Sequence, residues 1–338
     1  MAVIKEHVTN FQAEPAWREG VLEIPGEACL HHGGRLAARR LAWSLVGRAG
    51  APVVCALGGI GAGRRVCASR GGQGGWWSQI AGPGGALDTS RCRILGFDYL
   101  GSADSTAPEA GGEFPSLSTY DQADALWRLL EGLQLTALHA ITGASYGGMV
   151  ALAFAERYPE AVGRLVLISA ADRPSPLATA WRRIQRRIVL LARACGRTQE
   201  GLELAQALAA VSGHSPEELV ARFAEAPRRE AGCFVFPVEE ALIGQALEAA
   251  SRMQAESFLC LAESTDLHRI DAGRIFVPTT AVAVREDMVV PLADVRALVA
   301  RLPRGRLREI SSLYGHDAFL KEAEQLRGIL AAGLELEA

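Results

Sequence analysis

The chain has 338 residues, of which 49% are hydrophobic and 22% charged, so it is neither disordered nor fibrous and is long enough for one large domain or two. Its 35 basic and 38 acidic residues give a net charge of −3, without the basic excess typical of proteins that bind nucleic acid. No apolar run reaches the ~18 residues of a membrane span, and the mixed, charged segment 1–15 is unlike a signal peptide. We therefore expect no nucleic-acid partner and no membrane association.

The cysteines are seven in number, scattered, and never spaced C-x-x-C. An odd, scattered set argues against a disulfide framework and against a zinc site, and it favours a reducing compartment. We therefore expect a cytoplasmic protein without a bound metal. The set consists of Cys29, Cys55, Cys67, Cys92, Cys195, Cys233 and Cys260.

Short buried strands alternate with helices in the first half of the chain. Ser118, followed three residues later by Asp121, marks the start of one helix. This alternation predicts a mostly parallel sheet with helices on both faces. In chain order we expect a hairpin over 28–47 turning at His32–Gly34, a strand within 51–63 that enters a glycine loop, a strand over 91–101, a helix over 118–131, a strand over 138–143, a helix over 147–159 and a strand over 163–171.

The pattern changes after residue 171. From 172 to 266 we find helical stretches and no strong strand, with one helix over 181–195 and another starting at Ser215-Pro216. Strand and helix signals then return over 274–284, 292–302, 308–311 and from 317 onward. The sequence therefore predicts an α/β core formed by residues 1–170 and 267–338 and interrupted by a helical lid, 171–266.

Gly143-Ala144-Ser145-Tyr146-Gly147 is a G-x-S-x-G motif between a predicted strand and a predicted helix. A nucleophilic serine on such a sharp turn needs small flanking residues, because strand and helix nearly touch there. The same residues could also form a glycine-rich junction whose serine does no chemistry. The strand before the motif and the helix after it favour Ser145 as a nucleophile.

A serine nucleophile needs a base, and the base needs an acid that orients it. In this class of fold the chain order is serine, acid, histidine. Asp287 follows the strand over 274–284, and His316 follows the next one, so we predict Asp287 as the acid and His316 as the base. Glu286 is the rival acid. The six other histidines precede Ser145 or lie in or beside the predicted lid.

An acyl-transfer site also needs two backbone N–H groups for the developing oxyanion. We predict that Tyr146, the residue after the nucleophile, supplies one of them. The other comes from the loop after the early strand, where Leu57 is the first candidate and Gly58 the second.

Several separated motifs between about 50 and 320 resemble the homoserine O-acyltransferases of the α/β-hydrolase superfamily. GASYGGMVALAFAERYP, GGWWSQIAGPGGALDTSR, the Gln185-Arg186 pair and the C-terminal GHDAFL carry the resemblance. It implies an α/β-hydrolase fold. It also implies ping-pong transfer of an acyl group from acyl-CoA to the hydroxyl of L-homoserine, a step of methionine biosynthesis.

By the same resemblance, Arg186 holds the substrate carboxylate and Asp317 its ammonium group. Arg186 could instead be a solvated residue of a charged helix face, and Asp317 could cap the last helix. The resemblance further implies a homodimer through the lid, with CoA as a co-substrate and no bound cofactor.

The loop Cys55-Ala56-Leu57-Gly58-Gly59, Tyr146 and the segment 100–108 depart from the usual family pattern, which leaves the donor open between acetyl-CoA and succinyl-CoA. Arg64 and Arg65, close to the oxyanion loop, would favour the carboxylate of a succinyl donor. Serine is an alternative acceptor, and water is another, which would make the chain an esterase or thioesterase.

Overall fold

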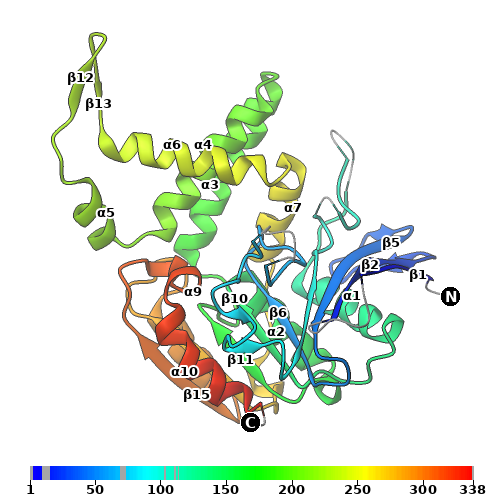
Figure 1. The fold of residues 1–338 in the computed structure, drawn as a ribbon. Helices are drawn as coiled ribbons and strands as arrows, with labels where there is room; N and C mark the ends of the chain where they lie inside the picture. The colour runs from blue at the N-terminus through cyan, green and yellow to red at the C-terminus, as the bar shows by residue number, and fades with distance from the viewer. Residues whose placement is uncertain are drawn as a thin grey trace.

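A computed structural model describes residues 3–9, 16–68, 74–102, 104–109, 112 and 114–336. Within these residues the main sheet has nine strands in the order β1-β2-β5-β9-β6-β10-β11-β14-β15 (Figure 1). In chain order they are β1 (Val3–Thr9), β2 (Ala16–Ile24), β5 (Arg39–Gly47), β6 (Val53–Leu57), β9 (Arg93–Phe97), β10 (Ala140–Ala144), β11 (Leu165–Ile168), β14 (Thr279–Val284) and β15 (Gly305–Ile310).

In the main sheet, β9, β6, β10, β11, β14 and β15 pair in parallel with their neighbours in that order. At the other side of the sheet β1, β2 and β5 pair antiparallel, and β5 also pairs antiparallel with β9. The inner parallel strands β6, β9, β10, β11 and β14 are largely buried on both faces, so they appear in the sequence as apolar runs, whereas the edge strand β15 is mostly not buried. Successive side chains of β6 point to opposite faces of the sheet. Cys55 accordingly packs in the hydrophobic cluster on one face and Val54 in the cluster on the other. The predicted mostly parallel α/β sheet is therefore confirmed.

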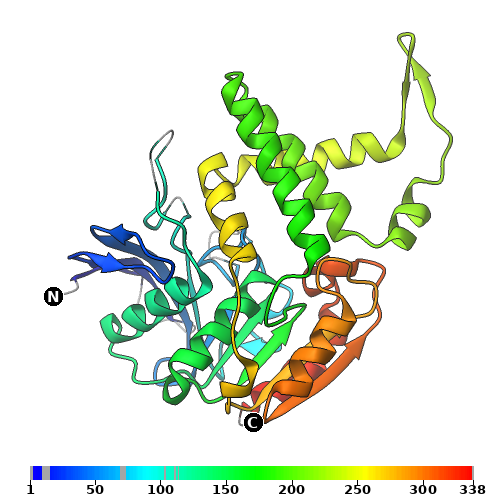
Figure 2. The ribbon, with the colours of Figure 1, turned by 180° about the vertical axis from the view of Figure 1, so that it is seen from behind.

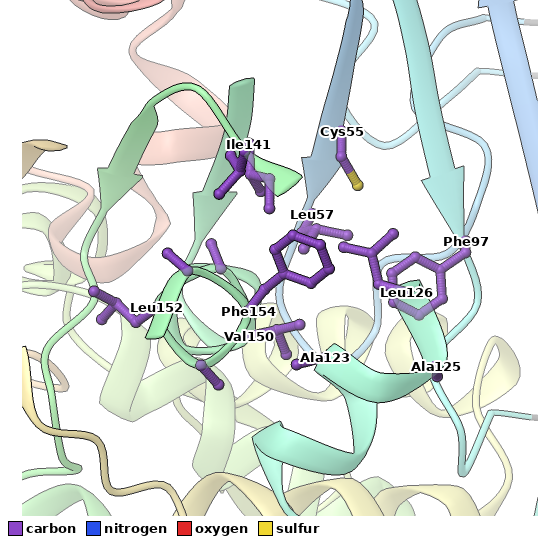
Figure 3. Packing of buried hydrophobic residues seen from close by; sticks show 14 of the residues in the cluster. Cys55, Leu57, Phe97, Ala123, Ala125, Leu126, Ile141, Val150, Leu152 and Phe154 are labelled. Carbon is purple, nitrogen blue, oxygen red and sulfur yellow. The ribbon is translucent and has the colours of Figure 1, made fainter. Parts of the chain in front are cut away.

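Helices cover both faces of the sheet. On one face lie α1 (Thr119–Gly132), α2 (Tyr146–Arg157) and α8 (Leu292–Arg301), and on the other lies α10 (Ala323–Leu334). Figure 3 shows α1 and α2 packing Leu126 and Phe154 against the strand residues Leu57 and Phe97, all of them buried. Ser118 begins α1 with the expected capping box, in which Asp121 is the reciprocal partner.

Between β11 and β14 the chain forms a largely helical segment that extends away from the sheet (Figures 1 and 2). We call residues 175–266 the lid segment, from the N-cap residue of its first helix to the last residue of its last helix. The predicted boundaries at 171 and 266 stay a prediction. Its helices are α3 (Pro176–Ala194), α4 (Thr198–Gly213), α5 (Pro216–Phe223), α6 (Pro237–Ser251) and α7 (Ala255–Asp266).

The structure corrects the predicted elements at three places. The lid segment contains a hairpin, β12 (Arg228–Glu230) and β13 (Cys233–Val235), which the sequence did not suggest because its strands are short and mostly exposed. Strands β1 and β2 were also missed, since most of β2 is only half-buried. The hairpin expected over 28–47 is reduced to β3 (Ala28–Cys29) and β4 (Arg35–Leu36), because residues 39–47 join the main sheet as β5.

The remaining short elements lie around the later loops. The helix expected from 317 is divided into α9 (Ala318–Lys321) and α10, with Glu322 between them. A third small pair joins β7 (Ala81–Gly82) and β8 (Leu87–Asp88), and single 3-10 turns are η1 (Pro159–Ala161), η2 (Ala272–Arg274) and η3 (Gly315–Asp317). No helix in the described ranges is long and apolar enough to cross a membrane.

Candidate active site

The three predicted triad residues and the predicted oxyanion donor Leu57 lie at or just after the end of a parallel strand. Ser145 follows β10, Asp287 follows β14, His316 follows β15, and Leu57 is the last residue of β6. Parallel strands bring their carboxyl ends to one edge of the sheet, which is where open α/β sheets place their ligands. The fold therefore gathers at one edge residues that lie up to 259 positions apart in the chain.

Ser145 sits on a strained turn between β10 and α2. Its φ of 54° and ψ of −123° fall in a region that non-glycine residues rarely occupy. A Cβ at Gly143 would lie 2.5 Å from the Gly147 carbonyl oxygen, and a Cβ at Gly147 would lie 2.3 Å from the Leu57 carbonyl oxygen. A side chain at either position would clash with the backbone, so both positions of the motif need glycine, as expected next to a nucleophile on a sharp turn.

Ser145, His316 and Asp287 form one hydrogen-bonded line. His316 Nε2 lies 2.8 Å from Ser145 Oγ, and His316 Nδ1 lies 2.8 Å from Asp287 Oδ2. Asp287 is buried, and its other carboxylate oxygen accepts from the backbone N–H groups of Val289 and Val290 at 2.9 and 2.8 Å. The structure brings together the three side chains predicted as a triad, in an order of contacts that suits proton transfer from Ser145 to His316.

The charges around His316 keep it basic. Burial by itself would lower the pKa of His316, but the charge and the hydrogen bond of Asp287, with a contribution from the charge of Asp317, raise it above its ordinary value. The charge of Arg182 acts in the opposite direction. The imidazolium that forms when His316 takes a proton is therefore stabilised by two carboxylates.

Glu286, the rival acid, does not contact His316. Its carboxylate accepts instead from the Ser311 hydroxyl and from the Ser312 N–H, the latter at 2.8 Å. Burial would raise the pKa of Glu286, and these two bonds lower it below its ordinary value. Geometry therefore favours Asp287 as the acid and gives Glu286 a role in holding the loop before His316.

The two predicted oxyanion donors lie beside the nucleophile. Tyr146 is the first residue of α2, where a backbone N–H has no partner within the helix. Leu57 is buried at the end of β6, against Gly147, and Gly58 accepts from Gly147 N–H at 2.9 Å. The cavity wall itself begins two residues later, at Gly59, so the donor role of Leu57 stays a prediction.

A cavity of about 460 Å³ opens above the nucleophile, between the sheet edge and the lid segment. Its charged wall consists of Arg182, Arg252 and Asp317, of which Arg182 and Asp317 are near enough to His316 to affect its pKa. Apolar side chains such as Met253, Phe258 and Phe319 form much of the rest. This size and this mixed lining suit a small polar substrate with an apolar arm.

Arg182, and not Arg186, lines this cavity. Arg182 Nε donates to one oxygen of Asp266 at 2.7 Å, and Arg186 donates to the other oxygen at 2.6 Å. One nitrogen of each arginine is buried without a hydrogen-bond partner, a terminal nitrogen of Arg182 and Nε of Arg186. Arg186 lines a separate cavity of about 230 Å³ that also contains Arg183. The structure thus differs from the expected placement of Arg186, because that side chain lines the separate cavity while Arg182, bound to the same Asp266, lines the catalytic one.

Asp317, the predicted partner of a substrate ammonium group, lines the same cavity as Arg182. It also contributes to the last part of the fold, since it precedes α9, but its side chain makes no cap hydrogen bond there. Asp317 is thus the N-cap residue of α9 by position, without a capping hydrogen bond from its side chain, which leaves its carboxylate free to face the cavity. Asp317 packs close to Gly213 of the lid segment, where a Cβ would lie 3.6 Å from one of its carboxylate oxygens.

Arg64 does not line the catalytic cavity. Its guanidinium is paired with the buried carboxylate of Asp98 and with Asp104, the latter at 2.8 Å. Two carboxylates therefore already neutralise Arg64, which removes the physical basis for expecting it to hold the distal carboxylate of a donor. Within the described part of the chain, no group of three or more His, Cys, Asp or Glu side chains could hold a metal ion.

Residues 52–323 match the family model described as the alpha/beta hydrolase fold, the class of protein that this sheet and nucleophile turn define. The chain is 41% identical to a homoserine O-succinyltransferase of Xanthomonas campestris pv. campestris, over 96% of this chain and 86% of the relative. It is 35% identical to a homoserine O-acetyltransferase of Thermus thermophilus, over 78% and 73%, and 29% identical to a serine O-succinyltransferase of Litchfieldella anticariensis, over 92% and 96%. The chain belongs to the homoserine O-acyltransferase family.

Solved structures show how widely the fold is shared. A homoserine O-acetyltransferase from Bacillus anthracis superposes with a TM-score of 0.83 at 16% identity, covering 100% of this chain and 99% of that one. Esterase E22 superposes equally well, with a TM-score of 0.83 at 17% identity, over 98% and 100%. At these identities the similarity concerns the fold alone, so the choice between a transferase and an esterase depends on the site.

Proposed function

We propose that this chain transfers an acyl group from acyl-CoA to the side-chain hydroxyl of L-homoserine through a covalent Ser145 intermediate. One observation carries the proposal: the hydrogen-bonded line of Ser145, His316 and Asp287 opens into a cavity that also presents Arg182 and Asp317. Water needs no such pair of charges, whereas a zwitterionic amino acid needs one of each sign.

In the proposed first half-reaction, Ser145 Oγ attacks the thioester carbonyl carbon while its proton passes to His316 Nε2. Asp287 holds the resulting imidazolium, and the N–H groups of Tyr146 and Leu57 receive the oxyanion. The C–S bond then breaks, His316 returns the proton to the CoA thiolate, and an acyl-Ser145 ester remains.

In the second half-reaction, His316 takes the proton of the acceptor hydroxyl, whose oxygen attacks the acyl-Ser145 ester. Collapse of the intermediate breaks the bond to Ser145 Oγ, which recovers its proton from His316. The lid segment covers the cavity and limits the entry of water, which would otherwise hydrolyse the acyl-enzyme. CoA acts as a co-substrate in this scheme, and no metal or tightly bound cofactor takes part.

For the acceptor, we assign the carboxylate to Arg182 and the ammonium group to Asp317. Arg182 lines the catalytic cavity, and one of its terminal nitrogens is buried there without a hydrogen-bond partner. A buried donor without an acceptor is costly unless a ligand supplies one. Arg186, the residue that the family resemblance suggested, acts through Asp266 in this scheme by holding the shared carboxylate.

For the donor, we propose succinyl-CoA, with acetyl-CoA as the second candidate. The support is the succinyltransferase name of the relative that is 41% identical over 96% of the chain. We further propose a homodimer through the lid segment, in the cytoplasm. Leu177, Ile184 and Leu191 of α3 are each at least half exposed and are spaced seven residues apart, which places them on one face where a second copy would bury them.

A matrix of two donors against two acceptors tests this function. Succinyl-CoA and acetyl-CoA are each combined with homoserine and with serine, CoA release is followed with a thiol reagent, and products are identified by mass spectrometry. We expect release that depends on homoserine and is fastest with succinyl-CoA, and none with Ser145→Ala. Equal CoA release with and without an amino acid would instead identify a thioesterase.

The two arginines are separated by a matched pair of variants. Arg182→Gln should raise KM for homoserine by roughly 10- to 100-fold, the cost of one charge-assisted hydrogen bond. It should have little effect on 3-aminopropan-1-ol, which lacks the carboxylate. Arg186→Gln should have the smaller effect on homoserine. A larger rise in KM for homoserine in Arg186→Gln than in Arg182→Gln would assign the homoserine carboxylate to Arg186. A loss of activity in Arg182→Gln that is confined to succinyl-CoA would assign Arg182 to the donor.

A further inference from the structure

Two helices of the lid segment start in the same way. Both α3 and α5 begin with a Ser-Pro pair, Ser175-Pro176 and Ser215-Pro216, in which the serine is the N-cap and proline the first helical residue. Each serine oxygen accepts an N–H of its own helix, from Ala178 at 3.2 Å or from Glu218 at 3.0 Å. Both serines are buried, and these contacts alone would make them ordinary helix caps.

Each of these hydroxyl groups also donates a hydrogen bond out of the lid segment, to a loop that carries a triad residue. Ser215 Oγ donates to the carbonyl oxygen of Leu313, three residues before His316. Ser175 Oγ donates to the carbonyl oxygen of Val289, two residues after Asp287, at 3.2 Å. Because one hydroxyl both caps and donates, the start of each lid helix is fixed relative to one catalytic loop.

The contact at Leu313 matters because little else holds that residue. The side chain of Leu313 is 53% exposed, so its position depends on its backbone. Two residues later, a Cβ at Gly315 would lie 3.0 Å from the Gly213 carbonyl oxygen and 3.1 Å from Ser215 N. The turn 213–215 of the lid segment therefore lies directly against the residue that precedes His316.

The contact at Val289 reaches Asp287 by an equally short path. The N–H of Val289 donates to Asp287 Oδ1 at 2.9 Å, while Asp287 Oδ2 faces His316. A shift of Val289 would therefore move the carboxylate that orients the base. The carbonyl oxygen of Val289 accepts from Ser175 Oγ, so Val289 is held at both its N–H and its carbonyl group.

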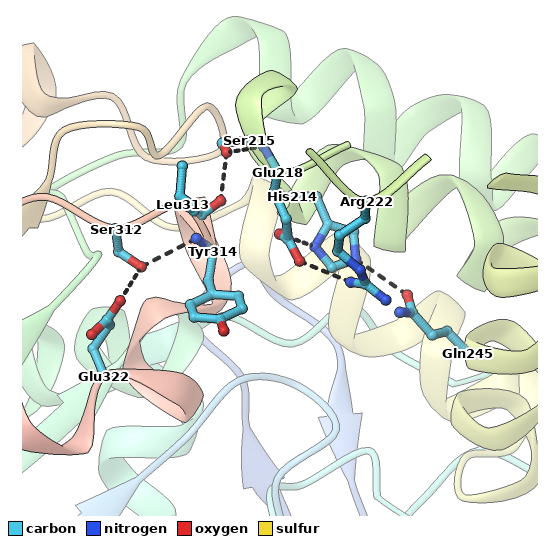
Figure 4. Close-up of polar contacts among 9 residues, drawn as sticks. All are labelled: His214, Ser215, Glu218, Arg222, Gln245, Ser312, Leu313, Tyr314 and Glu322. Carbon is cyan, nitrogen blue, oxygen red and sulfur yellow. Dashed lines mark hydrogen bonds and ion pairs between the residues drawn. The ribbon is translucent and has the colours of Figure 1, made fainter. Parts of the chain in front are cut away.

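The turn around Ser215 is itself braced inside the lid segment, as Figure 4 shows. Glu218 accepts from Arg222 at 2.8 Å and lies 2.6 Å from His214 Nδ1, and His214 Nε2 lies 3.2 Å from Gln245 of α6. His214 and Glu218 are both buried. The Ser215 hydroxyl is therefore presented to Leu313 by three connected lid helices, α4, α5 and α6.

On the core side, the loop before His316 has its own supports. The Ser312 hydroxyl donates to Glu322 at 2.7 Å and accepts from Tyr314 N–H at 3.1 Å (Figure 4). The Ser312 N–H donates to Glu286 at 2.8 Å. Those bonds hold residue 312, and Ser215 holds residue 313 from the opposite side. The loop is thus held between the core and the lid segment.

We propose that Ser175 and Ser215 are positioning residues that align Asp287 and His316 with Ser145 by tying each catalytic loop to the start of a lid helix. The inference rests on the proposed function only for the roles of the triad. Under it, an intact lid segment is a condition for an aligned base and not only a cover over the cavity.

The test measures how fast a fluorophosphonate labels Ser145 in the full-length protein, across pH 5 to 9, in Ser215→Ala and Ser175→Ala. This rate reports the triad without any acyl-CoA or acceptor. We expect labelling at least about tenfold slower than in the parent, because small misplacements of reacting groups are costly. In Ser175→Ala, the apparent pKa of labelling should also fall, because Asp287 is what raises the pKa of His316.

The matched control is Ser118→Ala, which removes the N-cap of α1 in the core without touching a catalytic loop. It should lower the unfolding midpoint by a similar amount and label at the parent rate. Ser175→Thr, which keeps a hydroxyl, should restore most of the rate. Ser215→Gly keeps most of the capping free energy and loses the donor, so it provides a second variant if Ser215→Ala folds poorly.

The proposal is overturned if Ser175→Ala and Ser215→Gly label within twofold of the parent at every pH, with stability losses like that of Ser118→Ala. The two serines would then be helix caps and nothing more. Failure of the proposed function gives a different result: the parent would be labelled in a Ser215-dependent manner and yet transfer no acyl group to homoserine. A parent that is not labelled at Ser145 would contradict both.

Discussion

Asp287→Asn tests the orientation of the base most directly. Asp287 Oδ1 accepts two backbone N–H groups, from Val289 and Val290, so an asparagine at 287 must keep its carbonyl oxygen on that side. Its amide NH₂ group would then face His316 Nδ1, which at present lies 2.8 Å from a carboxylate oxygen. His316 would have to accept there, and its proton would move to Nε2, the atom that should take the proton of Ser145.

The expected loss follows from this change of tautomer together with the loss of charge. A base held in the wrong tautomer lowers kcat by roughly 10³- to 10⁴-fold, equivalent to about 4–5.5 kcal/mol of transition-state free energy. KM for the acyl donor should change little, because Asp287 does not line the cavity. The measurements are steady-state CoA release and the rate of fluorophosphonate labelling at Ser145.

Glu286→Gln is the matched control, since it neutralises the neighbouring carboxylate, which holds Ser311 and Ser312 and does not contact His316. We expect a loss of no more than about tenfold from this change in the loop. The reasoning fails if Asp287→Asn retains more than about a tenth of the parent kcat, or if Glu286→Gln is the more damaged of the two.

Three further predictions concern the pH dependence of the reaction, the packing of Gly147 and the reactivity of Cys260. Because His316 must be neutral to take a proton and its pKa is raised, kcat/KM should fall as the pH drops through a midpoint above the ordinary histidine value of about 6.5; a midpoint below it would contradict the assigned environment. Gly147→Ala should lower the unfolding midpoint and slow labelling of Ser145, because its Cβ would lie 2.3 Å from the Leu57 carbonyl oxygen; parent-like behaviour would show that the turn can relax. Burial raises the pKa of Cys260 to about 12, so in a thiol titration at pH 8 this residue should react only after unfolding, unlike the exposed cysteines; rapid reaction in the folded protein would show that the α7 surface opens.

The parts of the fold that the sequence predicts are those whose burial leaves a strong pattern. Strands β6, β10 and β11 are buried on both faces and appear as apolar runs. Strand β2 is half-buried, so its pattern is weak, and the β12–β13 hairpin has almost no buried residue. The turn of this hairpin is Ala231-Gly232, with φ of 46° and 88°. Because alanine rarely adopts a positive φ, this pair is not a strong hairpin signal in the sequence.

The residues of the candidate site likewise fall into those that the sequence predicts and those that it does not. Ser145, Asp287 and His316 could be predicted because strand ends and chain order fix where they lie. The choice between Arg182 and Arg186 could not be predicted, because residues four apart share one helix face. Both side chains also bind Asp266, and only the different cavities that they line separate them. Ser215 was predicted as a helix start, whereas Ser175 was missed, because the helix there was expected only from residue 181. The second bonds of both serines join segments about 100 residues apart, which no local pattern reveals.

The place where the lid segment enters the sheet has an evolutionary consequence. Strands β11 and β14 are neighbours with Leu165 opposite Thr279, although the whole lid segment lies between them in the chain. An insertion that leaves and returns between adjacent strands can lengthen, shrink or be exchanged as a cassette without breaking a single strand pair. Recombination at this junction can therefore replace the lid segment and, with it, part of the cavity wall that faces the acceptor. A replacement segment must still provide hydroxyl groups for the carbonyl oxygens of residues 289 and 313.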